Sequence, residues 1–126
     1  MPKTVPALPG IPPSRYPFSE VVEANGFVFL AGQVGDVPGQ PGAVPGGIEA
    51  ETRQMLENVG RLLRGAGLDY SDAVRCTVYL TDMSNFAAYN QIYREYFPTD
   101  PPARASLQVA GLVSPYTIEI EVTAAR

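Results

Sequence analysis

The sequence lacks histidine and tryptophan and contains a single cysteine, Cys76, among its 126 residues. Without histidine, catalytic triads in which an imidazole serves as general base are excluded. One cysteine can neither form an internal disulfide nor supply the clustered soft ligands of a zinc site. We therefore expect no metal site, and any catalysis must depend on carboxylates, arginine, hydroxyl groups, amides and water.

Positive charge is also scarce, because 9 Lys and Arg residues are outnumbered by 13 Asp and Glu residues, for a formal net charge of −4. The basic residues are scattered and form no patch that would bind a phosphate backbone, so we expect no nucleic-acid partner. No apolar run approaches the roughly 20 residues needed to span a bilayer. The N-terminus also lacks the pattern of a secretory signal, which leads us to expect a cytoplasmic protein with no membrane partner.

Proline and glycine concentrate in two segments of the chain. Residues 1–17 are rich in proline, which fixes φ and removes backbone donors, so we expect an extended arm there. Residues 38–47 are rich in proline and glycine, show no hydrophobic period, and predict an exposed loop. With 45% hydrophobic residues, residues 1–126 are expected to form one domain with a modest core.

Hydrophobic periodicity in the rest of the chain predicts five strands and two helices. One helix is expected over residues 49–65. A second is expected to be capped by Asp82 or Ser84 and to end near residue 97, with an apolar, aromatic stripe of Phe86, Tyr89, Tyr93 and Phe97. The pair Asn25-Gly26 signals a tight turn between the first two strands, which should form a hairpin. The expected strands cover residues 18–23, 27–31, 74–80, 104–110 and 117–124.

The element order ββαβαββ predicts an α+β domain in which two helices cover one face of a single sheet. The strand over residues 27–31 is apolar on both faces, and such strands need both faces shielded. Because two helices shield only one face, we expect the other face to contact further copies of the chain, as obligate interfaces resemble a divided domain core. The alternative is a monomer in which loops cover this strand.

Polar residues alternate along the last two expected strands. If these strands pair as a hairpin, Arg104, Ser106 and Glu119 become neighbours on the sheet face that the helices do not cover. A guanidinium there can hold a small carboxylate by two parallel hydrogen bonds, and a nearby carboxylate can deprotonate a water molecule. A cross-strand salt bridge between Arg104 and Glu119 or Glu121 is the other interpretation, and spacing alone favours it.

Several short motifs resemble the Rid family, the reactive intermediate deaminases that act on enamines and imines. The similarity runs over about residues 16–125, and Ala-Gly-Gln, Pro-Ala-Arg and Ile-Glu-Ile-Glu in this order are its most specific part. The resemblance implies a chorismate-mutase-like α+β fold and a homotrimer around a central barrel, with three active sites between subunits. The matching segments are residues 17–20, 25–33, 85–90, 102–106 and 118–121.

The resemblance also implies roles for individual residues. Arg104 matches the arginine that binds the substrate carboxylate, and Glu119 matches the glutamate that positions the attacking water. Ser106 falls where family members have a small residue that helps to hold this water, and Gly32 matches a glycine whose backbone lies against the ligand. Asn90 matches an asparagine near the pocket, although its amide could equally satisfy backbone groups.

One position departs from the family pattern. Phe18 stands where many active members have tyrosine, so the ring that walls the pocket is kept while a phenolic hydrogen bond is lost. Tyr16 would lie on the same side if this segment were extended, but Pro17 between them restricts that geometry. The sequence therefore predicts neither the range of substrates nor the rate of the reaction.

The family resemblance predicts a hydrolytic deaminase for reactive enamines and imines of the 2-aminoacrylate and 2-iminobutanoate type. The products would be a 2-oxo acid and ammonia, and no cofactor is required, because imine hydrolysis needs only positioning and acid–base help. The main alternative is a trimeric binding protein for small carboxylate metabolites, which Phe18 motivates. Ribonuclease activity, sometimes attributed to relatives, fits poorly with the negative charge and the absence of histidine.

Overall fold

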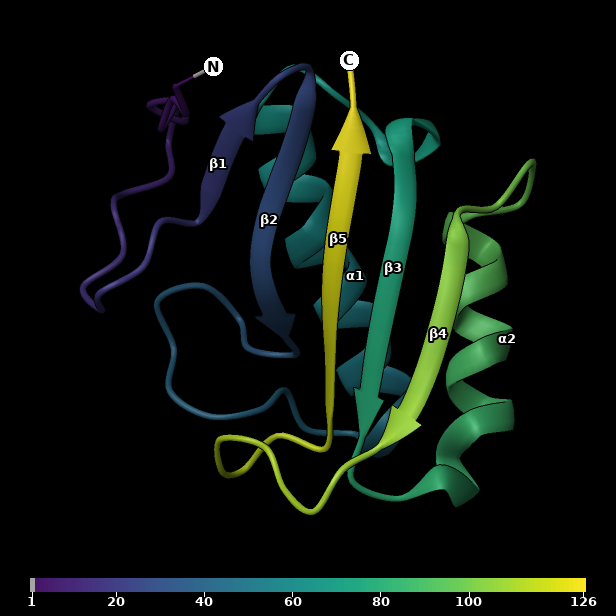
Figure 1. Ribbon diagram of the computed structural model, residues 1–126. Coiled ribbons are helices and arrows are strands. Elements are labelled where there is room, and N and C mark those ends of the chain that lie inside the picture. Colours follow the sequence, from purple (N-terminus) through teal and green to yellow (C-terminus); the bar gives the residue numbers. More distant parts are fainter. Residues whose placement is uncertain (1) are drawn as a thin grey trace.

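Five strands form one mixed sheet, and two helices cover one of its faces (Figure 1). The computed structural model describes residues 2–126, so Met1, the first residue of the predicted arm, lies outside the described residues. The helices are α1 (Gly47–Gly65) and α2 (Phe86–Tyr96), and short 3₁₀ turns precede β3 and α2. The strands are β1 (Val21–Ala24), β2 (Phe27–Val34), β3 (Ala73–Leu80), β4 (Ala103–Gln108) and β5 (Ile118–Ala125).

The predicted hairpin at the start of the fold is confirmed. Strands β1 and β2 pair antiparallel, with Ala24 opposite Phe27, and the two residues between them both have positive φ, 56° at Asn25 and 82° at Gly26. Asparagine and glycine tolerate this conformation, which a two-residue hairpin turn requires. The first strand begins at Val21 rather than at Phe18, because the segment before it bends at residues 15–18.

The predicted pairing of the last two strands is wrong. The strand order is β1-β2-β5-β3-β4, so β3 lies between β4 and β5. Strand β4 runs parallel to β3, because α2 connects them as a crossover and a crossover returns the chain in the same direction. Strand β5 then fills the central position, antiparallel to both β2 and β3.

The core lies between the sheet and the helices. On α1, which begins two residues earlier than predicted, Met55, Leu56, Val59, Leu62 and Leu63 are fully buried. The aromatic stripe of α2 is confirmed and packs on the sheet, while Asp82 caps the 3₁₀ turn before α2 rather than α2 itself. None of the helices in residues 2–126 is long and apolar enough to cross a membrane.

The two faces of β2 differ as the sequence predicted. Val28 and Leu30 are buried under α1, whereas Phe27 and Phe29 on the opposite face are each 44% exposed. The face of the sheet that carries Phe27 and Phe29, here called the open face, is turned away from both helices (Figure 1). Such a pair of exposed aromatic side chains on a strand is typical of a surface that another protein covers.

A buried carboxylate attaches the loop before β5 to the first helix. Glu51 in α1 is only 5% exposed, and its side chain accepts hydrogen bonds from the backbone N–H and the hydroxyl of Thr117, at 2.7 and 2.6 Å. The N–H of Ile118 lies 3.3 Å from the same carboxylate. These bonds fix where β5 begins and therefore where Glu119 lies.

The substitution Glu51→Ala should lower the free energy of unfolding by about 3 kcal/mol, because it leaves buried N–H groups without partners. The measurement is urea unfolding at one fixed chain concentration. Glu49→Ala, an exposed carboxylate in the first turn of the same helix, is the control and should cost less than about 1 kcal/mol. Equal losses in the two variants would contradict this role of Glu51.

Candidate active site

Three aromatic rings of α2 surround the guanidinium group of Arg104. Arg104 lies opposite the fully buried Cys76 in the β3–β4 pairing, so its side chain turns toward α2. Its Cζ atom is 4.6 Å from the ring centre of Tyr93, 5.3 Å from that of Tyr89 and 5.7 Å from that of Phe86. Cation–π packing of this kind holds a guanidinium in place without using its hydrogen-bond donors.

Among residues 2–126, no carboxylate forms an ion pair with Arg104. Its Nη1 atom is buried without a hydrogen-bond partner. In the part of the chain that the structure describes, the ion pairs join Arg53 to Glu95 and Arg126 to Glu23. A fixed and unpaired guanidinium is suited to bind a carboxylate through two parallel hydrogen bonds.

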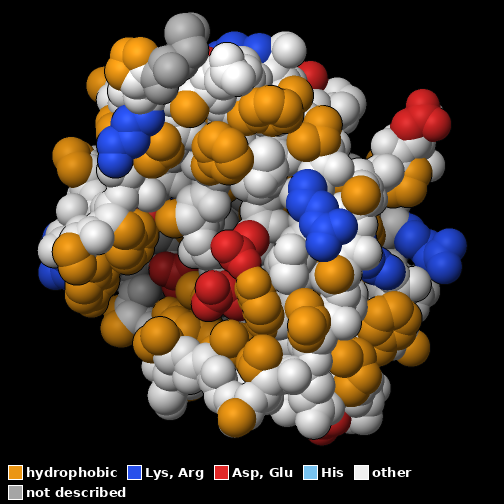
Figure 2. Space-filling model, in the orientation of Figure 1, with side chains coloured by type: hydrophobic (Ala, Val, Ile, Leu, Met, Phe, Trp, Pro, Cys, Tyr) orange, Lys and Arg blue, Asp and Glu red, His pale blue; other side chains and the backbone are white. Residues whose placement is uncertain are grey.

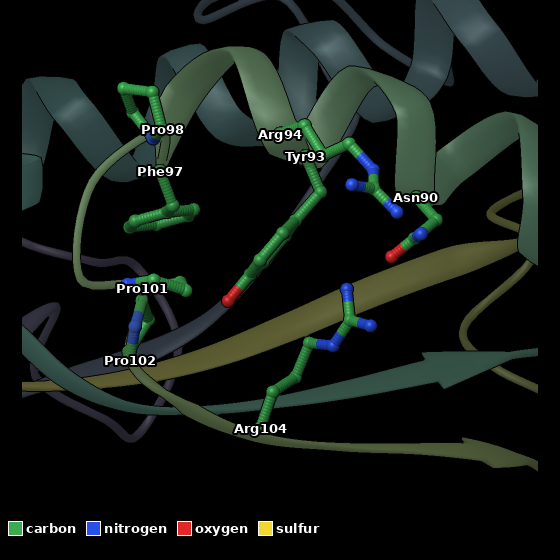
Figure 3. Close-up of a pocket in the computed structure, with 8 residues that line it drawn as sticks. All are labelled: Asn90, Tyr93, Arg94, Phe97, Pro98, Pro101, Pro102 and Arg104. Atoms are coloured by element: carbon green, nitrogen blue, oxygen red, sulfur yellow. The ribbon is translucent and has the colours of Figure 1, made fainter.

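A cavity of about 610 Å³ opens beside Arg104, between α2, the segment 98–102 and β4 (Figure 3). This volume lies within the range of small-molecule sites, about 300–1,000 Å³. Asn90 lines the same cavity from α2, and its predicted role beside a ligand stays a prediction. The lining residues include no carboxylate: they are Asn90, Tyr93, Arg94, Phe97, Pro98, Pro101, Pro102 and Arg104.

Ser106 shares a hydrogen bond of 2.6 Å with Tyr89, whose side chain is fully buried. Burial raises the pKa of Tyr89, so the phenol stays protonated at neutral pH. The two hydroxyl groups therefore hold one another in a fixed orientation. Tyr89 belongs to the predicted apolar stripe of α2, and its bond to Ser106 was not predicted, although a phenol in such a stripe signals a polar partner inside the fold.

Two further buried groups lie close to Arg104. The hydroxyl of Tyr93 is buried without a hydrogen-bond partner, and burial raises its pKa. Burial also raises the pKa of the Cys76 thiol. A thiol in this state is a poor nucleophile, so Cys76 is not a candidate for covalent catalysis.

Glu119 occupies the open face of the sheet. Its neighbours Ile118 and Ile120 are fully buried on the helix side, and Glu119 therefore points the other way. Figure 2 shows acidic side chains near the middle of this face with hydrophobic side chains around them, and β5 directs Glu119 and Glu121 to it. No group of three or more potential ligands in residues 2–126 is placed to hold a metal ion.

The environment of Glu119 favours its protonated form more than water does. Desolvation by burial raises the pKa of its carboxyl group above the ordinary value of 4.5, and the charge of Glu121 raises it further. A carboxylate with a raised pKa is a stronger proton acceptor than a surface carboxylate. Gly32 lies directly beneath it, and a Cβ atom at position 32 would collide with the Glu119 carboxylate.

The predicted site is therefore divided between the two faces of the sheet. Asn90, Arg104 and Ser106 form an arginine half-site under α2, whereas Gly32 and Glu119 form a glutamate half-site on the open face. The prediction that Arg104, Ser106 and Glu119 are neighbours on one polar face is wrong within a single chain. The physical reason is the crossover: β4 pairs with β3, and Arg104 follows Cys76 to the helix side.

Phe18 lies outside both half-sites, in the bend that precedes β1. Its side chain is 51% exposed, and its ring stacks on that of Tyr16, with ring centres 6.3 Å apart and an angle of 10° between the planes. The two rings thus lie side by side although Pro17 separates them in the chain. The role of the Phe18 ring as a wall of the ligand pocket stays a prediction.

Comparison with known proteins gives consistent matches along the chain. Residues 11–126 match the family model described as Endoribonuclease L-PSP. The 2-iminobutanoate/2-iminopropanoate deaminase of Mus musculus is 42% identical over 108 residues, which cover 86% of this chain and 80% of the mouse protein. Reactive Intermediate Deaminase A, chloroplastic, of Arabidopsis thaliana is 41% identical over 90% of this chain, which spans 60% of the plant protein.

Solved structures agree with these sequence matches. Yeast Mmf1 superposes with a TM-score of 0.91 at 32% identity and covers 99% of each chain. RidA from the Antarctic bacterium Psychrobacter sp. PAMC 21119 superposes with a TM-score of 0.85 at 31% identity, over 91% of this chain and 93% of the other. The resemblance found in the sequence motifs is thereby confirmed, and the chain belongs to the Rid (L-PSP) family.

Proposed function

We propose that this protein hydrolyses reactive enamines and imines derived from amino acids, of the 2-aminoacrylate and 2-iminobutanoate type, to 2-oxo acids and ammonia. The observation that carries the proposal is the guanidinium of Arg104, which is fixed by three aromatic rings, lacks a carboxylate partner and lines a cavity without acidic residues. The names of the mouse and Arabidopsis relatives support the same reaction.

The complete site is proposed to form between copies of the chain in a homotrimer. Arg104 and Glu119 lie on opposite faces of one sheet, so no single chain brings both to one substrate. The open face carries exposed phenylalanine side chains that a neighbouring copy can bury. In this arrangement the arginine half-site of one copy faces the glutamate half-site of the next.

The reaction divides between the two half-sites. Arg104 binds the substrate carboxylate, which places the imine carbon against a water molecule held by Glu119 and the hydroxyl of Ser106. The water oxygen bonds to this carbon, the C=N electrons move to nitrogen, and Glu119 accepts the water proton. That proton then passes to the nitrogen, which becomes an amino group. As the C–N bond breaks, Glu119 takes the hydroxyl proton and returns it to the departing nitrogen, so that ammonia leaves and the 2-oxo acid forms.

The remaining predicted residues shape the cavity in this proposal. The backbone of Gly32, beside Glu119, is proposed to lie against the ligand, Phe18 to supply an aromatic wall in the assembled protein, and Asn90 to contribute an amide to the cavity. No cofactor takes part. Cleavage of RNA, which the description of the family model suggests, is disfavoured by the net charge of −4 and by the absence of histidine.

The variant Arg104→Ala should lower kcat/KM for enzymatically generated 2-iminobutanoate roughly 10- to 100-fold, because it removes charge-assisted hydrogen bonds to the carboxylate. Rates are measured after subtracting spontaneous hydrolysis. Arg104→Lys, which keeps the charge but loses the paired donors, should fall between the wild type and the alanine variant. Arg64→Ala removes an exposed arginine from the last turn of α1 and should match the wild type.

The wild type itself decides between catalysis and binding. If it does not accelerate imine hydrolysis but binds small carboxylates through Arg104, the chain is a metabolite-binding protein and the deaminase proposal is wrong.

The variant Glu119→Gln should lower kcat roughly 100-fold or more, because an amide cannot accept the water proton. In the wild type the active form is the carboxylate. Since the pKa of Glu119 is raised, kcat/KM should fall as the pH drops through a value above 4.5. Glu121→Gln removes a repelling charge and should move this acid limb to lower pH. Full activity of Glu119→Gln would refute the mechanism.

A substitution on the open face tests whether the protein forms the proposed trimer. Phe29→Lys should convert the trimer to smaller species in sedimentation analysis, because it places a charge in the proposed interface, and imine hydrolysis should decline in parallel. Val113→Lys, in an exposed loop where the side chain is 74% exposed, is the matched control and should leave the mass unchanged. A wild-type protein that sediments as a monomer at micromolar concentration would exclude the trimer.

A further inference from the structure

The cavity beside Arg104 contains a second arginine. Arg94 lies in the last turn of α2 and lines the same space as Arg104, which enters from β4. Figure 3 shows both guanidinium groups and the amide of Asn90 directed toward one region of the cavity. Asn90 and Arg94 are four residues apart on the helix, a spacing that places both side chains on one face. One bound carboxylate engages Arg104 and leaves this second polar cluster without an anion.

The acidic residue next to Arg94 is engaged elsewhere. Glu95 forms two hydrogen bonds with Arg53 of α1, at 3.0 and 3.2 Å, and thus points toward the other helix. The described ion pairs do not include Arg94, and the cavity lining contains no carboxylate to neutralise it. The positive charge of Arg94 is therefore available to a ligand.

Arg94 combines a helix-end position with a place in the wall of the cavity. Basic residues in the last turn of a helix interact favourably with the carbonyl groups there. Arg64 has that position in α1, and its guanidinium lies over the ring of Tyr70, 5.9 Å from the ring centre. Arg94 has the same position in α2 but borders a cavity instead.

A buried donor in the cavity also lacks a partner. Tyr93 is only 5% exposed, its hydroxyl forms no hydrogen bond, and in Figure 3 this hydroxyl points into the space between α2 and β4. A buried phenol without a partner is costly unless a ligand or water satisfies it. Together with Asn90 and the two arginines, Tyr93 makes the cavity a set of donors for more than one anionic group.

We propose that the cavity has a second carboxylate position, formed by Arg94 with Asn90, and that the protein prefers substrates with two carboxylates. The inference rests on the proposed function, since it names the substrate class of that same site: imines of dicarboxylic amino acids. Arg104 binds the carboxylate next to the imine carbon, and Arg94 binds the distal carboxylate. Arg94 is then a specificity-determining residue.

Binding of unreactive acids tests this site independently of catalysis. Titration calorimetry compares succinate and glutarate with butyrate, at low ionic strength and with the assembled wild-type protein. The diacids should bind about tenfold more tightly than butyrate, as expected for one added charge-assisted pair. The preference should disappear in Arg94→Ala, persist partly in Arg94→Lys, and persist fully in Arg64→Ala, which removes the same charge from the equivalent turn of α1.

The kinetic counterpart compares enzymatically generated 2-iminoglutarate with 2-iminobutanoate. The ratio of the two kcat/KM values should fall about tenfold in Arg94→Ala and stay unchanged in Arg64→Ala. Sedimentation of the same samples shows whether assembly is intact. A loss of diacid binding that accompanies dissociation of the protein would assign Arg94 to a subunit contact and overturn the inference.

Failure of this inference is distinguishable from failure of the proposed function. Equal affinities for diacids and butyrate, in a protein that hydrolyses imines, would overturn the second carboxylate position alone. A diacid preference that depends on Arg94, in a protein that does not accelerate imine hydrolysis, would retain the position and refute the deaminase.

Discussion

The crossover from β3 through α2 to β4 is the constraint on which the arginine half-site depends. It sets β4 parallel to β3 and carries Arg104 to the helix side, where rings of Phe86, Tyr89 and Tyr93 surround its guanidinium. The same helix supplies the hydroxyl that holds Ser106 and three of the side chains that line the cavity, those of Asn90, Tyr93 and Arg94. The helix α2 thus contributes side chains both to the core and to the candidate site.

The local parts of this fold could be predicted from the sequence, whereas the order of the strands could not. Asn25-Gly26, the period of residues 49–65 and the aromatic stripe each reflect interactions between residues close in the chain, and all were confirmed. The pairing of β4 with β3 rather than β5 depends on distant segments, which a short-range pattern does not encode. The alternation of polar and apolar residues along β4 predicted that Arg104 and Ser106 lie on the same face of the sheet. It did not predict whether this is the helix side or the open face.

The division of the site has an energetic consequence for the proposed trimer. If a ligand contacts two copies of the chain, its binding and the association of these copies stabilise each other. The raised pKa of Glu119 belongs to the isolated chain, and covering the open face would remove further water from this carboxylate and from Glu121 beside it. Assembly and proton uptake are then linked, and the acid–base behaviour of the site depends on the state of association.

The buried position of Cys76 makes this protein convenient for spectroscopic labelling. Because the chain has one cysteine and its side chain is fully enclosed with a raised pKa, thiol reagents have no accessible native target in the folded state. A cysteine introduced at an exposed position would react alone, so a fluorophore or spin label could be placed at a chosen point. Distances between identical labels would then report the geometry of the proposed trimer in solution.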